Sequence, residues 1–413
     1  MNKKAQISKK IIYNLVGSII DEIIQIRRKI HSNPEIMFKE HETASLIRNY
    51  LGKLNLQILK PYIETDTVGI IAGAGKDPGA NTGANAATGK TILLRADIDA
   101  LRIEEKTSLE WTSRNKGYAH LCGHDGHTAI LLGAVNVLSQ LTEYFCGNVK
   151  FVFQPAEEGG GGGKILVEKG ILDDLPRVDE VYGLHAWPGV KKGCFESCKG
   201  TLMSAVDDFS IEIKGKSGHA AMPNLAVDPI VTAAYVITAL QTIVSRNSDP
   251  IESVVVSITS LQGGTLTNVI PDSVIMKGTL RYFKKEKQEF FRNRIEEVVK
   301  GICNANNADY LFNFEPLYIP LVNNPDSVDF LGKVIKNLFG DGFWSNSAVP
   351  TTGAEDFAFF LDKRPGAFYR VGLGLDHPSL HNSLFDFDDT ILENAILSMC
   401  GIALNALGCD ISE

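Results

Sequence analysis

The sequence predicts an α/β protein whose larger domain, a mostly parallel sheet covered by helices, is interrupted by a smaller inserted βαββαβ domain. Near-continuous apolar strands alternate with helical segments over roughly the first two hundred residues, which is typical of a covered parallel sheet. The pattern then changes to β, α, β, β, α, β, and the earlier alternation resumes near residue 315. We therefore assign residues 1–199 and 315–413 to the larger domain and residues 200–314 to the inserted one.

The composition is that of an ordinary soluble domain protein. Of the 413 residues, 44% are hydrophobic and 22% are charged, and no apolar run reaches the roughly 18 residues of a membrane-spanning helix. Forty-one Lys and Arg against forty-nine Asp and Glu give a net charge of −8, the wrong sign for a nucleic-acid partner. Seven scattered cysteines, an odd number, favour a reducing compartment. We expect a cytoplasmic protein with neither a membrane nor a nucleic-acid partner.

Each element of the larger domain has its own signal. Residues 8–31 carry apolar side chains at helical spacing and end just before Pro34. Four strands are predicted at 67–74, 91–97, 148–154 and 180–186, and a helix is predicted at 128–138, between the second and third of them. Residues 76–90, rich in Gly, Ala and Asn, have the composition of a solvated surface loop. After the insertion, a helix, a strand and a closing helix are predicted at 328–340, 366–374 and 390–407.

The inserted domain has the split order of a ferredoxin-like unit. Its four strands are predicted at 207–215, 253–264, 273–283 and 309–317. Its two helices are predicted at 226–246 and 285–306. A unit of this length can bury a core of its own, so we expect it to fold as a separate domain.

Two short motifs join possible metal ligands to a break in regular structure. In HLCGHDGHT, Cys122 and His124 stand two residues apart, a spacing that lets both side chains face one point in a looped backbone. In FVFQPAEEGGGGGK, a Pro and Gly-rich turn can aim Glu157 and Glu158 at one site, one to bind a metal and the other to accept a proton. Taken singly, a buried core cysteine and two solvated glutamates explain these motifs as well.

Two histidines extend the set of candidate ligands. His185 ends the apolar strand EVYGLHA, where open α/β sheets bind their ligands, and His381 precedes the last predicted helix in SLHNSLFDFDD. A lone histidine at either place is more often structural than a ligand. Together the four motifs supply His, Glu and thiolate donors, which suit Zn²⁺ or a neighbouring divalent transition metal better than Ca²⁺ or Mg²⁺.

Ten motifs in a fixed order resemble one family over residues 27–407. They are RRKIHSNPEIMFKEHET, LLRADIDAL, HLCGHDGHTAILLGA, FQPAEEGGGG, YGLHAWPG, SGHAAMPN, GGTLTNVIPD, TLRYF, GAEDFAFF and LHNSLFDFDD. The set resembles the amidohydrolase branch of the metal-dependent aminoacylase and carboxypeptidase family, which includes hippurate hydrolases, N-acetyl amino acid deacetylases and plant indole-acetyl amino acid hydrolases. The resemblance covers both predicted domains and implies that the inserted one is a lid and dimerisation domain.

The resemblance implies a metal site with a catalytic carboxylate beside it. The implied ligands are Cys122, His124, Glu158, His185 and His381. Glu157 would take a proton from the attacking water, and Asp97 would orient one of the ligands without binding the metal itself. One or two divalent ions (Zn, Mn, Co or Ni) are expected. Arg95 stands where the wider family has a further metal-binding His, which leaves the number of ions open.

The resemblance also assigns roles to three residues of the inserted domain. His219 would polarise the scissile carbonyl, and Asn268 with Arg281 would hold the free carboxylate of the substrate. The planar guanidinium of Arg matches a carboxylate, and a cation near a developing oxyanion stabilises the transition state. Related enzymes close the lid over the substrate, and in several the His comes from the partner subunit. We therefore expect a homodimer formed through the lid domain.

The implied function is metal-dependent hydrolysis of the amide bond of N-acyl amino acids, with a small-molecule substrate. A dipeptidase or metallocarboxypeptidase is an open alternative, because no feature of the sequence separates peptide cleavage from acyl cleavage. A non-catalytic metal-binding protein of the same fold is disfavoured, since Glu157 is dispensable for binding a metal and is nevertheless present.

Overall fold

The computed structural model describes residues 5–75 and 89–413, so most of the predicted loop at 76–90 lies outside the described residues. These residues form two compact units. The first contains the chain up to Gly200, Val322–Val349 and Phe359–Glu413. The second contains Thr201–Leu321 and Pro350–Ala358. The second unit extends beyond the predicted range of the inserted domain, because its last strand continues to Tyr318 and because Pro350–Ala358 also belongs to it.

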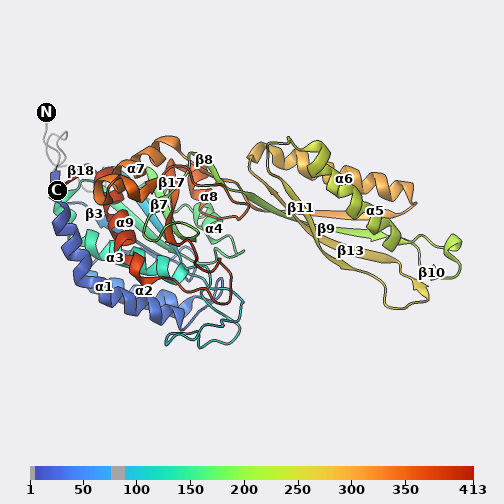
Figure 1. Ribbon diagram of the computed structural model, residues 1–413, viewed down its shortest axis with the longest axis horizontal. Coiled ribbons are helices and arrows are strands. Elements are labelled where there is room, and N and C mark those ends of the chain that lie inside the picture. Colours follow the sequence, from blue (N-terminus) through green and yellow to red (C-terminus); the bar gives the residue numbers. More distant parts are fainter. Residues whose placement is uncertain (1–4, 76–88) are drawn as a thin grey trace. The chain divides into compact units, whose positions relative to one another are not determined.

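The first unit is built on an eight-stranded sheet with the order β16-β7-β17-β6-β4-β5-β3-β2 (Figure 1). From one edge to the other, the strands are β16 (Trp344–Ser345), β7 (Phe195–Glu196), β17 (Gly366–Gly374), β6 (Glu180–Pro188), β4 (Thr91–Asp97), β5 (Asn148–Gln154), β3 (Thr67–Ala72) and β2 (Gln57–Ile58). The four central strands β17, β6, β4 and β5 are parallel, whereas β3 runs antiparallel to β5. The predicted fold class is confirmed, with a parallel centre in a mixed sheet.

Helices cover this sheet. They are α1 (Lys9–His31), α2 (His41–Leu51), α3 (His124–Ser139), α4 (Gly162–Glu168), α7 (Pro325–Phe339), α8 (Ala358–Lys363) and α9 (Leu392–Ala406). In Figure 1, α1, α3 and α9 lie side by side, and each contacts the other two. The middle helix α3 is buried along nearly its whole length, which explains its apolar sequence. Gly133 lets α9 approach α3 closely, because a Cβ there would lie 2.6 Å from Ile396.

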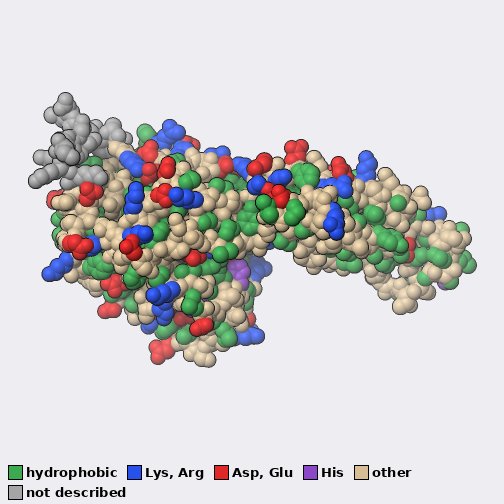
Figure 2. All heavy atoms as spheres, turned by 45° about the horizontal axis from the view of Figure 1, so that its top comes forward, with side chains coloured by type: hydrophobic (Ala, Val, Ile, Leu, Met, Phe, Trp, Pro, Cys, Tyr) green, Lys and Arg blue, Asp and Glu red, His purple; other side chains and the backbone are tan. Residues whose placement is uncertain are grey.

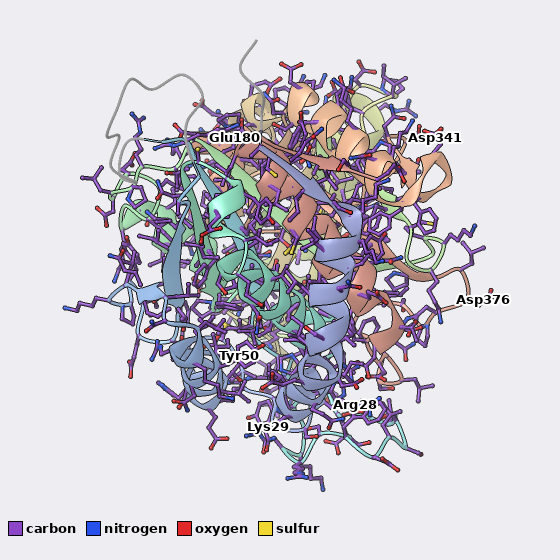
Figure 3. The ribbon with its side chains drawn as sticks, turned by 90° about the vertical axis from the view of Figure 1, so that its left-hand side faces the viewer. Arg28, Lys29, Tyr50, Glu180, Asp341 and Asp376 are labelled. Carbon is purple, nitrogen blue, oxygen red and sulfur yellow. The ribbon has the colours of Figure 1, made fainter. Side chains whose placement is uncertain are left out.

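Helix α1 is stabilised at both ends. The hydroxyl of Ser8 accepts a hydrogen bond from the Lys10 amide at the N-terminus. The last turn contains the cations Arg28 and Lys29, which interact favourably with the negative end of the helix dipole (Figure 3). Ahead of this helix, β1 (Ala5–Ser8) pairs in parallel with β18 (Cys409–Ser412), so the two ends of the described chain are joined.

The second unit has a four-stranded antiparallel sheet with the order β11-β13-β9-β14. Its elements follow in the chain as β9 (Ala205–Lys214), α5 (Pro229–Thr242), β11 (Val255–Gln262), β13 (Ser273–Tyr282), α6 (Gln288–Ala305) and β14 (Asp309–Tyr318). This is the predicted βαββαβ order. Alternate residues of β13 are buried, because α5 and α6 cover one face of the sheet. A ribbon of β10 (Gly218–His219) and β12 (Val269–Ile270) extends from it.

Several boundaries differ from the predicted ones for local reasons. Helix α7 begins at Pro325, earlier than predicted, because the side chain of Asn324 caps its first amides. Helix α5 ends at Thr242 and continues as a π-helical turn over Ile243–Asn247. The short strands β8 (Gly200–Met203) and β15 (Leu321–Asn323) lie where the chain passes between the units.

Charged side chains of both signs lie on the surface of the first unit. On the face drawn in Figure 2, cationic and anionic side chains are interspersed over the first unit. Among the described residues, no helix combines the length and the apolar character needed to cross a bilayer. All seven cysteines are free thiols.

Candidate metal centre

The candidate site lies where the central strands of the first unit end. Asp97 is the last residue of β4, and it pairs in register with Gln154, the last residue of β5. His185 lies in the second half of β6, and α3 begins at His124. The carboxyl ends of parallel strands meet at one edge of a sheet, which is where α/β proteins bind ligands. The chain therefore brings these side chains together from distant segments.

The five candidate ligands form two groups that share one sulfur atom. One donor atom from each of Cys122, His124 and His185 lies within 4.8 Å of the other two, and the same holds for Cys122, Glu158 and His381. The Cys122 Sγ lies 3.5 Å from His185 Nε2. The His381 Nε2 lies 3.2 Å from Glu158 Oε1. Cys122, His124 and His185 are buried, whereas the His381 side chain is about half exposed.

One buried donor atom of this cluster lacks a hydrogen-bond partner. The Nδ1 of His124 lies 2.9 Å from the Asp99 carbonyl, to which it donates, so Nε2 is the ring nitrogen that would bind a metal once it gives up its proton. Within the described part of the chain, that Nε2 has no hydrogen-bond partner, and one carboxylate oxygen of Asp97 and one of Glu158 each lie 3.9 Å from it. Buried polar atoms normally have one, and a metal ion would satisfy this nitrogen.

The local charge also fits a metal ion. Burial alone would lower the pKa of His124, but the carboxylates of Asp97 and Asp99 outweigh it and raise that pKa to about 10. Burial and the charge of Glu158 raise the pKa of the Cys122 thiol well above its usual range. A divalent cation would compensate this negative charge and favour the thiolate, so the residues present fit a transition metal.

The two adjacent glutamates are held by one carboxylate. The backbone amides of Glu157 and Glu158 donate to Asp99 Oδ1 and Oδ2 at 3.1 and 2.9 Å. Donor oxygens of both glutamates lie within 4.8 Å of a nitrogen of His124. Glu157 is 7% exposed and Glu158 is partly buried. Both carboxylates therefore face one site, as the Pro and Gly-rich turn predicts. The role of Asp99 was missed in the sequence analysis, although the motif RADIDAL contains it.

Asp97 contacts His127, which is not one of the candidate ligands. Its Oδ1 lies 2.6 Å from His127 Nδ1, and its Oδ2 accepts a hydrogen bond of 2.6 Å from Arg95. The Nε2 of His127 accepts from the Ala186 amide at 2.8 Å, so neither ring nitrogen of His127 is available to a metal. His127, which adjoins the cluster, is therefore a supporting residue. Asp97 Oδ2 lies 3.9 Å from His124 Nε2, beyond hydrogen-bond distance.

The three candidate residues of the second unit lie in two separate regions of it. His219 of β10 pairs in register with Val269 of β12, and the Asn268 carbonyl accepts a hydrogen bond from Ala220. His219 and Asn268 are therefore neighbours, and both are exposed. Arg281 lies near the far end of β13, eight residues beyond Ser273, which is about 27 Å along a strand. Within one chain, the structure does not bring Arg281 close to this pair.

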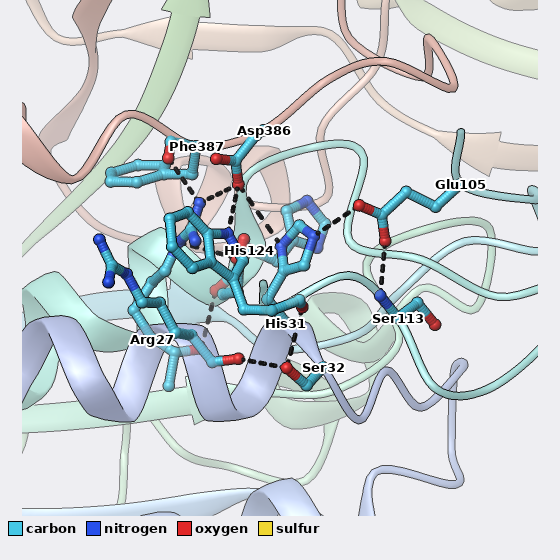
Figure 4. Close-up of polar contacts among 12 residues, drawn as sticks. Arg27, His31, Ser32, Glu105, Ser113, His124, Asp386 and Phe387 are labelled. Atoms are coloured by element: carbon cyan, nitrogen blue, oxygen red, sulfur yellow. Dashed lines mark hydrogen bonds and ion pairs between the residues drawn. The ribbon is translucent and has the colours of Figure 1, made fainter. Parts of the chain in front are cut away.

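A buried polar network holds the start of α3 (Figure 4). Asp125, which follows His124, forms an ion pair with Arg27, whose Nε lies 3.1 Å away, and accepts a hydrogen bond from His31 Nδ1 at 2.8 Å. The other ring nitrogen of His31 lies 3.3 Å from Glu105. Arg27 also bonds to Asp386. The network thus ties helix α1 to the residue next to a candidate ligand.

This network predicts a pH dependence of stability. Burial disfavours the charged form of His31, but Asp125 and Glu105 outweigh it and raise the pKa of His31 to about 9. A raised pKa stabilises the folded state below the unfolded-state pKa of about 6.5, and this stabilisation is lost as the pH rises through about 9. The shift corresponds to at most ~3 kcal/mol. We expect the melting temperature of the wild type to exceed that of His31→Gln at pH 6 and the difference to shrink by pH 9.5. A constant difference would contradict this.

Comparison with known proteins places the chain in a family. The family model described as peptidase family M20/M25/M40 matches residues 93–405, which include both candidate ligand groups. The chain belongs to this family. The resemblance found from the motifs is thereby confirmed at the family level.

Relatives of the chain carry names that describe different activities. The chain is 36% identical to thermostable carboxypeptidase 1 of Saccharolobus solfataricus, over 95% of this chain and 97% of that protein. It is 38% identical to an N-acetyl-L-cysteine deacetylase of Bacillus subtilis (92% and 87% covered) and 36% identical to a hippurate hydrolase of Campylobacter jejuni (95% and 100%). Among solved structures, a Bacillus subtilis protein described as a dinuclear metal binding peptidase is 33% identical, with a TM-score of 0.81 over 95% of this chain and 99% of that one.

Proposed function

We propose that this protein is a metal-dependent amidohydrolase that cleaves the amide bond of N-acyl amino acids and releases a carboxylic acid and a free amino acid. One observation supports this most directly. The buried carboxylate of Glu157 lies within 4.8 Å of donor atoms of His124 and Glu158, beside the two groups that hold the five proposed ligands. A protein that only bound metal would not need this sixth group. Two relatives whose names describe acyl-amide hydrolysis support the acyl substrate.

The chemistry needs a polarised carbonyl and a proton carrier. When bound, a divalent transition metal acts as a Lewis acid that polarises the amide carbonyl and acidifies water at the site. Glu157 takes a proton from the water molecule while the oxygen of that water bonds to the carbonyl carbon. Glu157 then gives that proton to the amide nitrogen as the carbon–nitrogen bond breaks. The hydrogen bond from the Glu157 amide to Asp99 fixes the backbone from which this carboxylate projects.

We further propose two ion positions that share Cys122. His124 and His185 would complete one position, and Glu158 and His381 the other. A thiolate at Cys122 would offer a negatively charged, soft donor to a divalent transition metal held by either group. Zn, Mn, Co and Ni are the candidate metals. Asp97 would act through His127 and Arg95 to hold the strand end beside the site.

For the second unit we propose a lid and dimerisation role, with residues 200–314 as the lid and residues 1–199 and 315–413 as the catalytic domain. His219 would polarise the scissile carbonyl, and Asn268 and Arg281 would bind the substrate carboxylate. His219 and Asn268 lie near one end of β13, whereas Arg281 lies near its other end. The three side chains of one chain therefore cannot contact the same small substrate. A homodimer in which His219 and Asn268 come from the partner resolves this. The free thiols support a cytoplasmic location.

A complementation experiment tests the shared site. Glu157→Gln keeps an intact lid, and His219→Ala keeps an intact metal centre. Each variant alone is expected to be nearly inactive. When the two chains are co-expressed, half of the dimers are mixed and each mixed dimer regains one complete site, so we expect about a quarter of the wild-type activity. No recovery in dimers shown to be mixed would contradict a site built from two subunits.

A substrate panel tests the reaction itself. Release of free amino acid is measured from N-acetyl, N-benzoyl and N-indole-acetyl amino acids and from dipeptides, with protein loaded with Zn²⁺, Mn²⁺ or Co²⁺. We expect turnover of at least one acylated amino acid that is abolished by chelator. Turnover of dipeptides alone would favour the peptidase alternative, which the carboxypeptidase relative also supports.

A further inference from the structure

Glu40 is a buried carboxylate outside the proposed catalytic groups. It lies just before α2, and its side chain has no solvent exposure. Its Oε1 accepts hydrogen bonds from the backbone amides of Phe38 at 3.0 Å and Ala156 at 2.9 Å. Its Oε2 accepts from the Thr65 hydroxyl at 2.9 Å. One side chain thus joins the loop before α2 to the turn after β5.

Both amides that share Oε1 belong to residues with a left-handed backbone. Phe38 has φ 60° and Ala156 has φ 59°. Such a conformation costs a residue with a Cβ about 1–3 kcal/mol, and the conformation persists only where the surrounding structure enforces it. The other non-glycine residues with positive φ in the described chain are Asn55, Asn307 and His381. The shared oxygen therefore holds two unfavourable conformations at once.

The strained turn leads directly into the candidate catalytic residues. Three consecutive amides, those of Ala156, Glu157 and Glu158, donate to two buried carboxylates, the first to Glu40 and the next two to Asp99. The Ala156 carbonyl accepts from the Gly162 amide at 3.0 Å. The peptide groups on both sides of Ala156 are thereby fixed, and this sets the direction in which Glu157 leaves the strand end.

The two loops also pack against each other. A Cβ on Gly160 would lie 2.9 Å from the ring of Phe38 and 2.6 Å from the Cβ of Ala156. The Phe38 loop therefore rests on the glycine turn, and Glu40 ties the two at the backbone. A displacement of either loop moves the other.

We propose that Glu40 is a positioning residue that holds the turn at Ala156 so that Glu157 faces the reacting water. This inference rests on the proposed function. The role requires an acceptor oxygen at Oε1 and not a negative charge. Burial and the neighbouring Asp99 raise the pKa of Glu40 to about 7, so a neutral side chain is tolerated at this place.

The test compares Glu40→Ala with Glu40→Gln in fully metal-loaded protein. Glutamine keeps an oxygen for the two amides, and its amide group can donate to Thr65, whose hydroxyl also accepts. We expect Glu40→Ala to lower kcat by about 10- to 100-fold with KM within about twofold, since small misplacements of a catalytic group cost this much. Glu40→Gln should restore kcat to within about threefold of the wild type.

Tyr50→Phe is the matched control. It removes another buried side-chain hydrogen bond, from Asn136 to the Tyr50 hydroxyl at 2.7 Å, on the helix that follows Glu40 (Figure 3). This variant should lose stability without losing kcat. Unchanged kcat in Glu40→Ala, an equal loss in Glu40→Gln, or an equal loss in Tyr50→Phe would each overturn the proposal.

A second measurement is independent of the substrate. Amide hydrogen exchange of the metal-loaded protein should be faster over residues 155–163 in Glu40→Ala than in the wild type, Glu40→Gln or Tyr50→Phe. Wild-type exchange in Glu40→Ala would overturn the positioning role. If no N-acyl amino acid were hydrolysed, the proposed function would fail while this measurement would still decide the role of Glu40.

Discussion

Replacing Glu157 with Gln is expected to lower kcat for N-acyl amino acid hydrolysis by about 10²- to 10⁴-fold, the usual contribution of a general base. The amide side chain has the same size but cannot take the proton from water. Its backbone amide still donates to Asp99, so the turn keeps its shape. Because Glu157 is not among the five proposed ligands, the metal content should equal that of the wild type. Kinetics and elemental analysis on the same sample check both statements.

Glu158→Gln is the matched control for this prediction. It changes the neighbouring glutamate by the same atoms, but Glu158 belongs to a proposed ligand group with Cys122 and His381. We expect it to lose metal as well as activity. If Glu157→Gln kept its activity, or if it lost as much metal as Glu158→Gln, Glu157 would not be the base.

The second large effect concerns the shared sulfur. Cys122→Ala removes a donor from both proposed ion positions, whereas His185→Ala removes a donor from one. After dialysis against metal-free buffer, we expect Cys122→Ala to retain little metal and His185→Ala to retain about one ion per chain. Elemental analysis of the dialysed proteins gives the result directly.

Cys400→Ala is the control for loss of a buried thiol. Cys400 is fully buried in α9, where its Sγ contacts the Ala134 carbonyl, and it belongs to neither ligand group. Its removal should leave the metal content unchanged. Equal metal retention in Cys122→Ala and the wild type would show that the sulfur is not a ligand.

Most of the fold could be predicted from the sequence because its signals are local. The strands β4, β5 and β6 are short apolar runs, and the helix period of α9 is clear over its whole length. The pairing of β1 with β18 was not predicted, because it joins residues from the two ends of the chain. The position of β3, antiparallel at the side of the parallel strands, also depends on pairing that no local pattern specifies.

The candidate site could be predicted in part for the same reason. Motifs point to Cys122 and His124 because their spacing is visible in the chain. The supporting contacts are not visible, because they join distant segments. Glu40 bonds to Ala156 across 116 positions, and the motif around each residue does not show that the two meet. The tautomer of His127 follows from the Ala186 amide, 59 positions away. Such roles require the three-dimensional structure.

The most direct test of the central claim is a metal titration of the reaction. The wild-type protein is stripped with chelator, and release of free amino acid from the best N-acyl substrate is followed as Zn²⁺, Mn²⁺ or Co²⁺ is added back. We expect no turnover in the stripped protein and a rise that saturates near about two equivalents of one of these metals per chain. Turnover by the stripped protein at the rate of the reloaded one would contradict a metal-dependent amidohydrolase.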